Sequence, residues 1–192
     1  MKIFVTVLVL LASIPVCAQP KISTSILYYD IHPSGLSDIG KEMHKRSPIK
    51  KKGTTFKGHT KWHVKWHFKW KKRKGVCRIS QVSTSLNVKY TMPRIPISYS
   101  VKPEVLNSFN NYYKALMRHE EGHKNSGLYA ARDIESSLLK LSTDNDNDCK
   151  RLSSSANRIG HKIINKYNQR DRDYDKKTIH GKSEGVDIKN FI

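Results

Sequence analysis

The chain has 192 residues, with 36 Lys or Arg against 16 Asp or Glu, so its formal net charge at pH 7 is +20. After residue 18 no segment is long and apolar enough to cross a bilayer, so we expect no transmembrane segment in the mature chain. The charge favours anionic surroundings such as envelope polymers or lipid headgroups. A solvated basic surface is the more common meaning of such lysine runs, and nucleic-acid binding is the less favoured option.

The first 18 residues have the pattern of a secretory signal peptide. Lys2 supplies a short basic start, residues 3–12 are apolar, and Val16-Cys17-Ala18 resembles a cleavage site that places the cut before Gln19. A lipoprotein anchored through Cys17 is the alternative, but the residues before this cysteine fit a lipidation site poorly. We therefore expect a periplasmic or secreted protein whose residues 19–192 form a single domain with one core.

Removal of the signal would leave two cysteines, Cys77 and Cys149. In an oxidising compartment an isolated pair more often forms a disulfide than a metal site. We expect this bridge to join the sheet region to the far end of a long helix. Two buried free thiols are the alternative.

The first half of the chain has strand patterns separated by turn residues. The clearest strand is residues 60–70, where apolar side chains from Trp62 to Trp70 alternate with Lys or His, so one face is apolar and the other basic. A turn at 71–75 and a second alternating strand at 76–90 predict an antiparallel hairpin. The other expected elements are a strand at 22–31, a short helix at 36–44, a basic loop at 46–58 and a break in the sheet at 92–96.

The second half of the chain predicts two helices. From Pro103, apolar residues recur at helical spacing through His119, Glu120 and His123 and on to Leu141, so these three residues continue an inward-facing stripe. An acidic, turn-prone link precedes a second helix at about 149–167, and a polar segment follows. The sequence thus predicts an α+β fold, in which a small antiparallel β-sheet packs on a long active-site helix and a second C-terminal helix, as in zincins.

The most informative pattern is His119-Glu120-Glu121-Gly122-His123, a His-Glu-x-x-His motif. On a helix, residues four apart lie on one face, so both imidazoles can bind one Zn²⁺ ion. Glu120 then lies beside the ion, placed to act as general base on a water molecule. Because the pattern arises by chance in roughly one chain in a hundred of this composition, it needs an inward face and a third ligand to carry weight.

Several patterns together resemble a family of predicted secreted bacterial zinc-dependent proteases, catalogued as a domain of unknown function. They are the Trp-rich strand before Cys77, Pro93, His119-Glu120-x-Gly122-His123, Cys149 and the closing pattern Tyr174-Asp175-x-x-Thr178-x-His180-Gly181-x-x-x-Gly185. Glu184 departs from the closing pattern, where Gln is expected, and we expect no consequence for metal binding. The resemblance covers most of the mature chain and implies a zinc peptidase-like domain that acts on a peptide or protein.

A catalytic zinc keeps three protein ligands and one open position. His180 is the first choice for the third ligand because Gly181 gives it a flexible turn, and Asp175 is the alternative. Tyr174, if it folds over the site, would hydrogen-bond the developing oxyanion. The substrate would bind as an added strand at an edge of the sheet.

Two other classes of function stay open. In the first, the chain is a non-catalytic, zinc-stabilised binding module in which Glu120 only supports the ligands. In the second, it is a basic protein that binds envelope polymers or nucleic acid, the motif is accidental, and binding falls steeply with salt. The agreement among the signal peptide, the inward stripe and the closing pattern places a zinc metalloprotease first.

Overall fold

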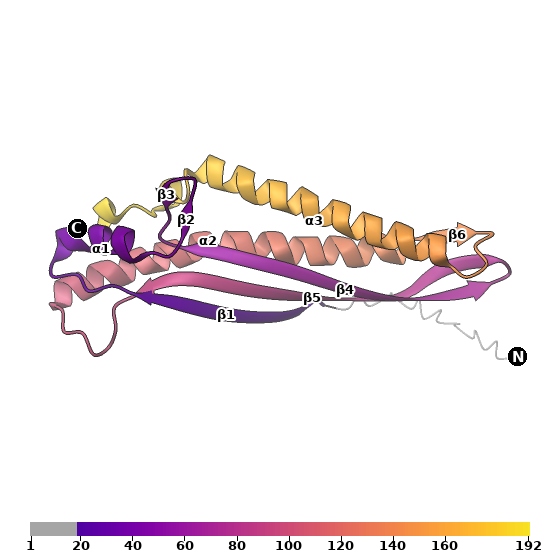
Figure 1. Cartoon of the computed structure of the whole chain (residues 1–192), viewed down its shortest axis with the longest axis horizontal. Helices are drawn as coiled ribbons and strands as arrows, with labels where there is room; N and C mark the ends of the chain where they lie inside the picture. Colours follow the sequence, from indigo (N-terminus) through magenta and orange to yellow (C-terminus); the bar gives the residue numbers. More distant parts are fainter. Residues whose placement is uncertain (1–18) are drawn as a thin grey trace, which may run out of the picture.

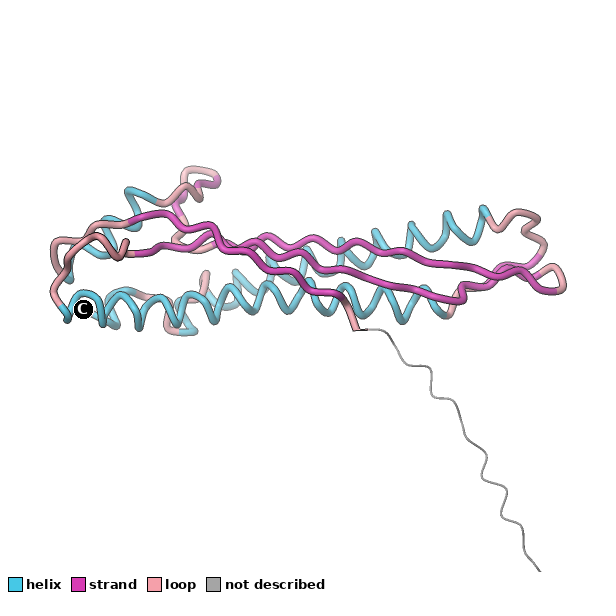
Figure 2. Tube along the Cα trace, turned by 90° about the horizontal axis from the view of Figure 1, so that it is seen from below, coloured by secondary structure: helices cyan, strands magenta, loops and turns pink. Residues whose placement is uncertain are grey.

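A long β-hairpin and a pair of long helices run side by side along most of the molecule (Figure 1). In this computed structural model, which describes residues 19–192, the hairpin is β4 (His59–Arg73) and β5 (Val76–Arg94), and the helices are α2 (Pro103–Leu139) and α3 (Lys150–Thr178). The predicted signal peptide lies outside the described residues. The predicted α+β fold is confirmed, since a small sheet packs against long helices (Figure 2).

The sheet is mixed rather than purely antiparallel. Its order is β1-β5-β4, with β1 (Lys21–Asp30) and β4 at the edges, and the short strand β6 (Ser142–Asp144) pairs with the start of β5. β4 and β5 are antiparallel, as predicted, but β1 runs parallel to β5. The chain leaves β1 and enters β4 at the same end of the molecule, and β5 then returns between them (Figure 1). This insertion makes β1 and β5 parallel neighbours.

Apart from β6, the smaller elements gather at the end of the molecule where the C-terminus lies (Figure 1). They are the 3₁₀ helix η1 (Leu36–Asp38), the helix α1 (Ile39–Arg46), the short strands β2 (Lys50–Lys51) and β3 (Thr54–Thr55), and the 3₁₀ helices η2 (Lys182–Glu184) and η3 (Ile188–Phe191). The expected loop at 46–58 therefore contains a two-stranded hairpin.

The alternation in β4 places its apolar side chains toward the helices as far as Phe68, as predicted, but a β-bulge between Lys69 and Trp70 interrupts it and Trp70 is exposed. Thr60 and Val64 are buried, Trp62 and Trp66 are half-buried, and the Lys and His residues between them are exposed. The buried stripe of α2 runs through His119, Glu120 and His123, of which only 4%, 4% and 8% is exposed. The prediction that the motif faces inward is confirmed.

Two predicted boundaries are wrong. β5 continues through Pro93 to Arg94, and a proline is tolerated there because β4 pairs with β5 only as far as Thr91. The helix α3 extends eleven residues beyond the expected end at about residue 167, to Thr178. Its polar second half is held by the contacts of one face with α2, which sequence periodicity does not reveal.

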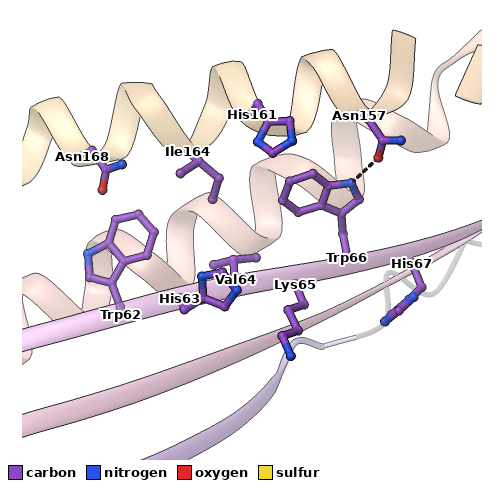
Figure 3. A pocket seen from close by; sticks show the side chains of 10 residues that line it. All are labelled: Trp62, His63, Val64, Lys65, Trp66, His67, Asn157, His161, Ile164 and Asn168. Atoms are coloured by element: carbon purple, nitrogen blue, oxygen red, sulfur yellow. Dashed lines mark hydrogen bonds between the residues drawn. The ribbon is translucent and has the colours of Figure 1, made fainter. Parts of the chain in front are cut away.

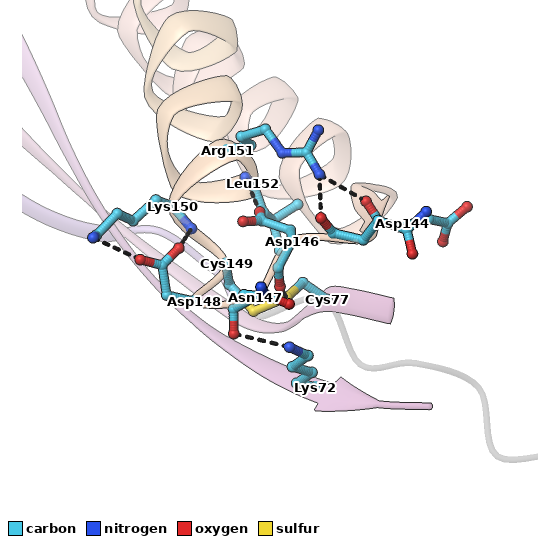
Figure 4. The surroundings of a disulfide bond; sticks show 11 residues. Lys72, Cys77, Asp144, Asp146, Asn147, Asp148, Cys149, Lys150, Arg151 and Leu152 are labelled. Atoms are coloured by element: carbon cyan, nitrogen blue, oxygen red, sulfur yellow. Dashed lines mark hydrogen bonds and ion pairs between the residues drawn. A yellow bond between two sulfur atoms is a disulfide. The ribbon is translucent and has the colours of Figure 1, made fainter. Parts of the chain in front are cut away.

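A disulfide joins Cys77 of β5 to Cys149, directly before α3, with 5.7 Å between the Cα atoms (Figure 4). This is the pairing that the sequence predicts, and it ties the sheet to the far end of the helix pair. No helix within residues 19–192 is both long enough and apolar enough to span a membrane.

Candidate metal centre

His119 and His123 lie one turn apart on the buried face of α2. Their Nε2 atoms lie 3.4 Å and 3.2 Å from the same oxygen, Oδ1 of Asp175. The candidate ligand atoms of these three residues all lie within 4.8 Å of one another. Two ligands at about 2.0–2.1 Å from a tetrahedral Zn²⁺ ion lie about 3.3–3.4 Å apart, so both distances to Asp175 match edges of such a tetrahedron.

The second half of α3 brings two carboxylates to this point. Asp171 and Asp175 are four residues apart on one helix, so both project from the same face toward α2. Because the sequence predicts that the second helix ends at about residue 167, it does not predict that Asp171 and Asp175 share a helical face. Asp175 was predicted only as the alternative third ligand, and Asp171 was not predicted at all.

Each histidine also has a carboxylate at its other ring nitrogen. Glu184 Oε2 lies 2.9 Å from Nδ1 of His119, and Asp171 Oδ1 lies 3.4 Å from Nδ1 of His123. Oδ1 of Asp171 is buried and has no hydrogen bond with favourable geometry among the described residues. A carboxylate at Nδ1 keeps the proton on that nitrogen and leaves Nε2 free to bind a metal ion. We expected no consequence of Glu184, yet this residue contacts a candidate ligand directly.

Glu120 is held beside the candidate ligands from the sheet. The hydroxyl group of Thr60, on β4, donates to Oε2 of Glu120 over 2.6 Å. The other oxygen, Oε1, lies next to Gly58, where a Cβ atom would come within 2.6 Å of it. Glycine at position 58 therefore lets the chain pack closely against Oε1 of Glu120 just before β4 begins. Burial raises the pKa of the Glu120 carboxyl, although the hydrogen bond from Thr60 opposes this effect.

Tyr174 packs against His119 and is not part of the lining of the cavity that opens onto the candidate ligands. Its ring stacks on His119 with 5.0 Å between the ring centroids, and its hydroxyl donates to Glu184 Oε2 over 2.8 Å. Gly122 makes this packing possible, because a Cβ atom there would lie 2.4 Å from the Tyr174 hydroxyl oxygen. Tyr174 thus orients Glu184 and His119, whereas the sequence suggested an oxyanion donor.

His180 lies at the rim of the centre. It follows the end of α3, where Ile179, His180 and Gly181 all have positive φ angles. Its side chain is 55% exposed, its Nδ1 lies 3.5 Å from Asp175 Oδ1, and its ring contacts Phe56 edge-on. The first choice of third ligand is therefore outside the cluster that contains Asp175.

The charges in the centre are strongly coupled. Burial lowers the pKa of both histidines, but contacts with Asp175 and Glu184 give His119 a raised pKa, and contacts with Asp171 and Asp175 raise the pKa of His123 to about 10. Burial raises the pKa of Asp175, but hydrogen bonds from both histidines outweigh it and hold that pKa well below its usual range. In a chain of net charge +20, four of the 16 acidic residues thus surround two histidines at one point. This arrangement suits a bound cation.

A cavity of about 940 Å³ opens onto the cluster. Its lining includes His119, Glu120, His123 and Asp175, together with residues 54–59 that lead from β3 into β4. The cavity is large enough to admit a segment of another chain or a sizeable small molecule.

The chain matches a known protein family. Residues 26–181 match the family DUF922, which is described as a bacterial protein of unknown function. No curated protein matches the chain, and no solved structure does.

Proposed function

We propose that this chain, which belongs to the bacterial family DUF922, is an exported zinc-dependent peptidase. The observation that carries the proposal is the approach of His119 Nε2 and His123 Nε2 to within 3.4 Å and 3.2 Å of one carboxylate oxygen of Asp175. Two imidazole nitrogens and a carboxylate oxygen are a common ligand set of catalytic zinc, which keeps its fourth position open.

The surroundings of the three ligands fit a divalent cation. Glu184 and Asp171 stand behind the two imidazoles, and such partners orient the rings and strengthen them as ligands. If a metal ion held His123 in place, the buried Oδ1 of Asp171 would accept a hydrogen bond from Nδ1 of that ring. His180, at 3.5 Å from Asp175, is close enough to orient that carboxylate and is exposed enough to meet a substrate.

Zinc bound there would polarise a peptide carbonyl group and lower the pKa of a water molecule. Glu120 is placed to take the proton of this water at Oε1, since Thr60 holds the opposite oxygen and Glu120 lines the cavity that opens onto the cluster. A carboxyl group with a raised pKa can hold the proton and pass it to the leaving amine. Hydrolysis of a peptide or protein is the reaction that these groups support.

The predicted signal peptide and the disulfide support export to the periplasm or the cell exterior. The basic surface would favour binding near anionic envelope polymers. The proposed reaction at the metal centre does not involve a nucleic acid.

Glu120→Gln tests the proposal when compared with Glu121→Gln, its exposed neighbour on α2. We expect the zinc-loaded Glu120→Gln protein to keep its metal and to lose roughly 10²- to 10⁴-fold in the rate of hydrolysis of an unfolded protein substrate. Glu121→Gln should keep both. A wild-type protein that binds zinc but hydrolyses no member of a broad peptide library would contradict the proposal and favour a zinc-stabilised binding module.

A further inference from the structure

The outer edge of β4 is a free strand edge within residues 19–192. β4 pairs with β5 along one side only, and the strand order ends there. A free edge offers backbone N–H and C=O groups in register to another extended chain. Because such edges promote aggregation, a long one is retained only where it is protected or used.

A groove of about 500 Å³ lies along this edge, between β4 and α3 (Figure 3). Its lining includes all six residues from Trp62 to His67. Successive side chains of a strand point to opposite faces, so a cavity that touches all of them runs along the edge itself. Six residues of strand span about 20 Å, the length of a bound segment of about six residues.

The two sides of the groove differ in chemistry. On the helix side, Trp62 and Trp66 point toward α3 and flank Ile164, which leaves an apolar recess between the two indole rings (Figure 3). Asn157 accepts a hydrogen bond from Trp66 over 3.1 Å, and His161 packs edge-on against the same ring, so Trp66 is held in place.

On the opposite side the groove is basic. Lys65 points away from α3, and none of the residues that line the groove is acidic (Figure 3). On the same face Lys61 lies directly opposite Lys89 of β5, and neither forms an ion pair within the described part of the chain. Like charges that face each other across a sheet are destabilising, and acidic side chains placed beside them remove the repulsion.

The same strand leads from the groove to the metal centre. Residues 57–59 line the cavity at the metal centre, and residues 62–67 line the groove. Trp62 marks the boundary, since its indole donates to Oδ2 of Asp171, whose other oxygen lies 3.4 Å from His123. A chain that lies along the edge of β4 would therefore continue into the cavity where Glu120 lies.

We propose that the edge of β4 binds an extended polypeptide in which apolar and acidic residues alternate, and presents it to the metal centre. An added strand would place its apolar side chains between Trp62 and Trp66 and its acidic side chains beside Lys65 and Lys61. This inference rests on the proposed peptidase function for the fate of the bound chain, but the binding itself does not require hydrolysis.

The probe is a fluorescein-labelled twelve-residue peptide of alternating Val and Glu, measured by anisotropy with the zinc-loaded Glu120→Gln protein. Peptides of alternating Val and Lys, and of Glu alone, are measured beside it. Asn168→Trp fills the groove from α3, and Asn165→Trp introduces the same side chain at an exposed position outside it. Lys65→Glu reverses the charge at the edge, with Lys162→Glu, exposed on α3, as its control.

We expect the Val–Glu peptide to bind best, Asn168→Trp to weaken its binding at least about tenfold, and Asn165→Trp to change it less than about twofold. Lys65→Glu should shift the preference toward the Val–Lys peptide, and Lys162→Glu should not. Equal effects of the two Trp substitutions, or equal binding of the Glu-only peptide, would overturn strand addition in favour of a general anion-binding face.

Hydrolysis is measured separately, with the wild-type protein and a four-residue substrate too short to span the groove. Cleavage of this substrate without selective binding of the Val–Glu peptide would overturn only the groove assignment. Selective binding of the Val–Glu peptide without any cleavage would sustain the groove assignment and overturn the peptidase.

Discussion

The helix pair is joined to the rest of the fold in different ways at its two ends. At one end the Cys77–Cys149 disulfide makes a covalent link, and Asp146 accepts a hydrogen bond from the backbone N–H of Leu152 in the first turn of α3 (Figure 4). At the other end the contact between α2 and α3 depends on ionisable groups, chiefly His119, His123 and Asp175. One end stays covalently fixed as long as the disulfide is oxidised, whereas the other depends on protonation and on any bound cation.

This difference indicates where function lies. Buried ion pairs contribute little net stability, because the cost of removing charges from water offsets their attraction. A fold that already has a disulfide gains little from a second, charged clamp made of histidines and carboxylates. This comparison supports the proposal that the charged end is a ligand-binding centre.

The largest expected effect is at the disulfide end. Replacing both Cys77 and Cys149 by Ser opens a bridge between residues 72 apart in the sequence, so the free energy of unfolding should fall by about 4 kcal/mol. Calorimetry would show a lower melting temperature. Zinc stoichiometry measured below the new melting temperature should not change, and a loss of zinc binding in the folded variant would contradict the independence of the two ends.

The next effect distinguishes the two candidates for the third ligand. Asp175→Asn should weaken zinc binding more than about 100-fold, because it removes the anionic oxygen that both imidazoles face. His180→Ala should weaken binding less than about tenfold, because His180 lies at the exposed rim. Competition with a chromophoric chelator measures both dissociation constants. The reverse order would assign the third ligand to His180.

Gly122→Ala tests the packing of Tyr174 against the charged end. The added methyl group would overlap the Tyr174 ring, so the free energy of unfolding should fall by about 1–3 kcal/mol. Gly35→Ala is the control, since a Cβ atom there meets nothing within 4 Å. Denaturant titration measures both, and equal stability of the two variants would contradict the close approach of α3 to α2.

The smallest effect is expected at Glu184, whose carboxylate contacts Nδ1 of His119. Glu184→Ala should weaken zinc binding roughly 10- to 100-fold, because the orientation and proton position of the imidazole are lost. Glu184→Gln keeps a hydrogen-bond acceptor for Nδ1 and should weaken binding less. Glu121→Ala, on the exposed face of α2, serves as control and should leave the zinc affinity unchanged.

The sequence predicts those parts of the molecule that local periodicity determines. Alternation from Trp62 to Phe68 predicts both faces of β4, although it does not reveal the bulge that leaves Trp70 exposed. Helical spacing places His119, Glu120 and His123 on the inner face of α2. Glycines at 122 and 127 suggest close approach of a neighbouring element, and Tyr174 approaches Gly122 while Leu86 and Trp62 approach Gly127.

The remaining features depend on how distant segments meet. The residue pattern of a single strand does not reveal that β5 lies between β1 and β4. The polar second half of α3 lacks an apolar stripe, so its helical structure is not predicted either. The register of α3 against α2 selects Asp171 and Asp175 as the carboxylates at the histidines and leaves Asp173 on the exposed side. No spacing rule ranks these three, because the choice is made by tertiary packing. Asp171 lies one helical turn before Asp175 of the closing pattern, so the two would share a face once this segment is known to be helical.

The central claim is that α2 and α3 together hold one zinc ion, and metal content tests it most directly. Mature wild-type protein and the His119→Ala, His123→Ala and Asp175→Asn variants would be exposed to zinc, dialysed and measured by mass spectrometry for zinc per folded chain. The account predicts about one zinc per wild-type chain and a large loss in all three variants. A folded wild-type protein that retains no zinc, or variants that all retain it, would contradict the account.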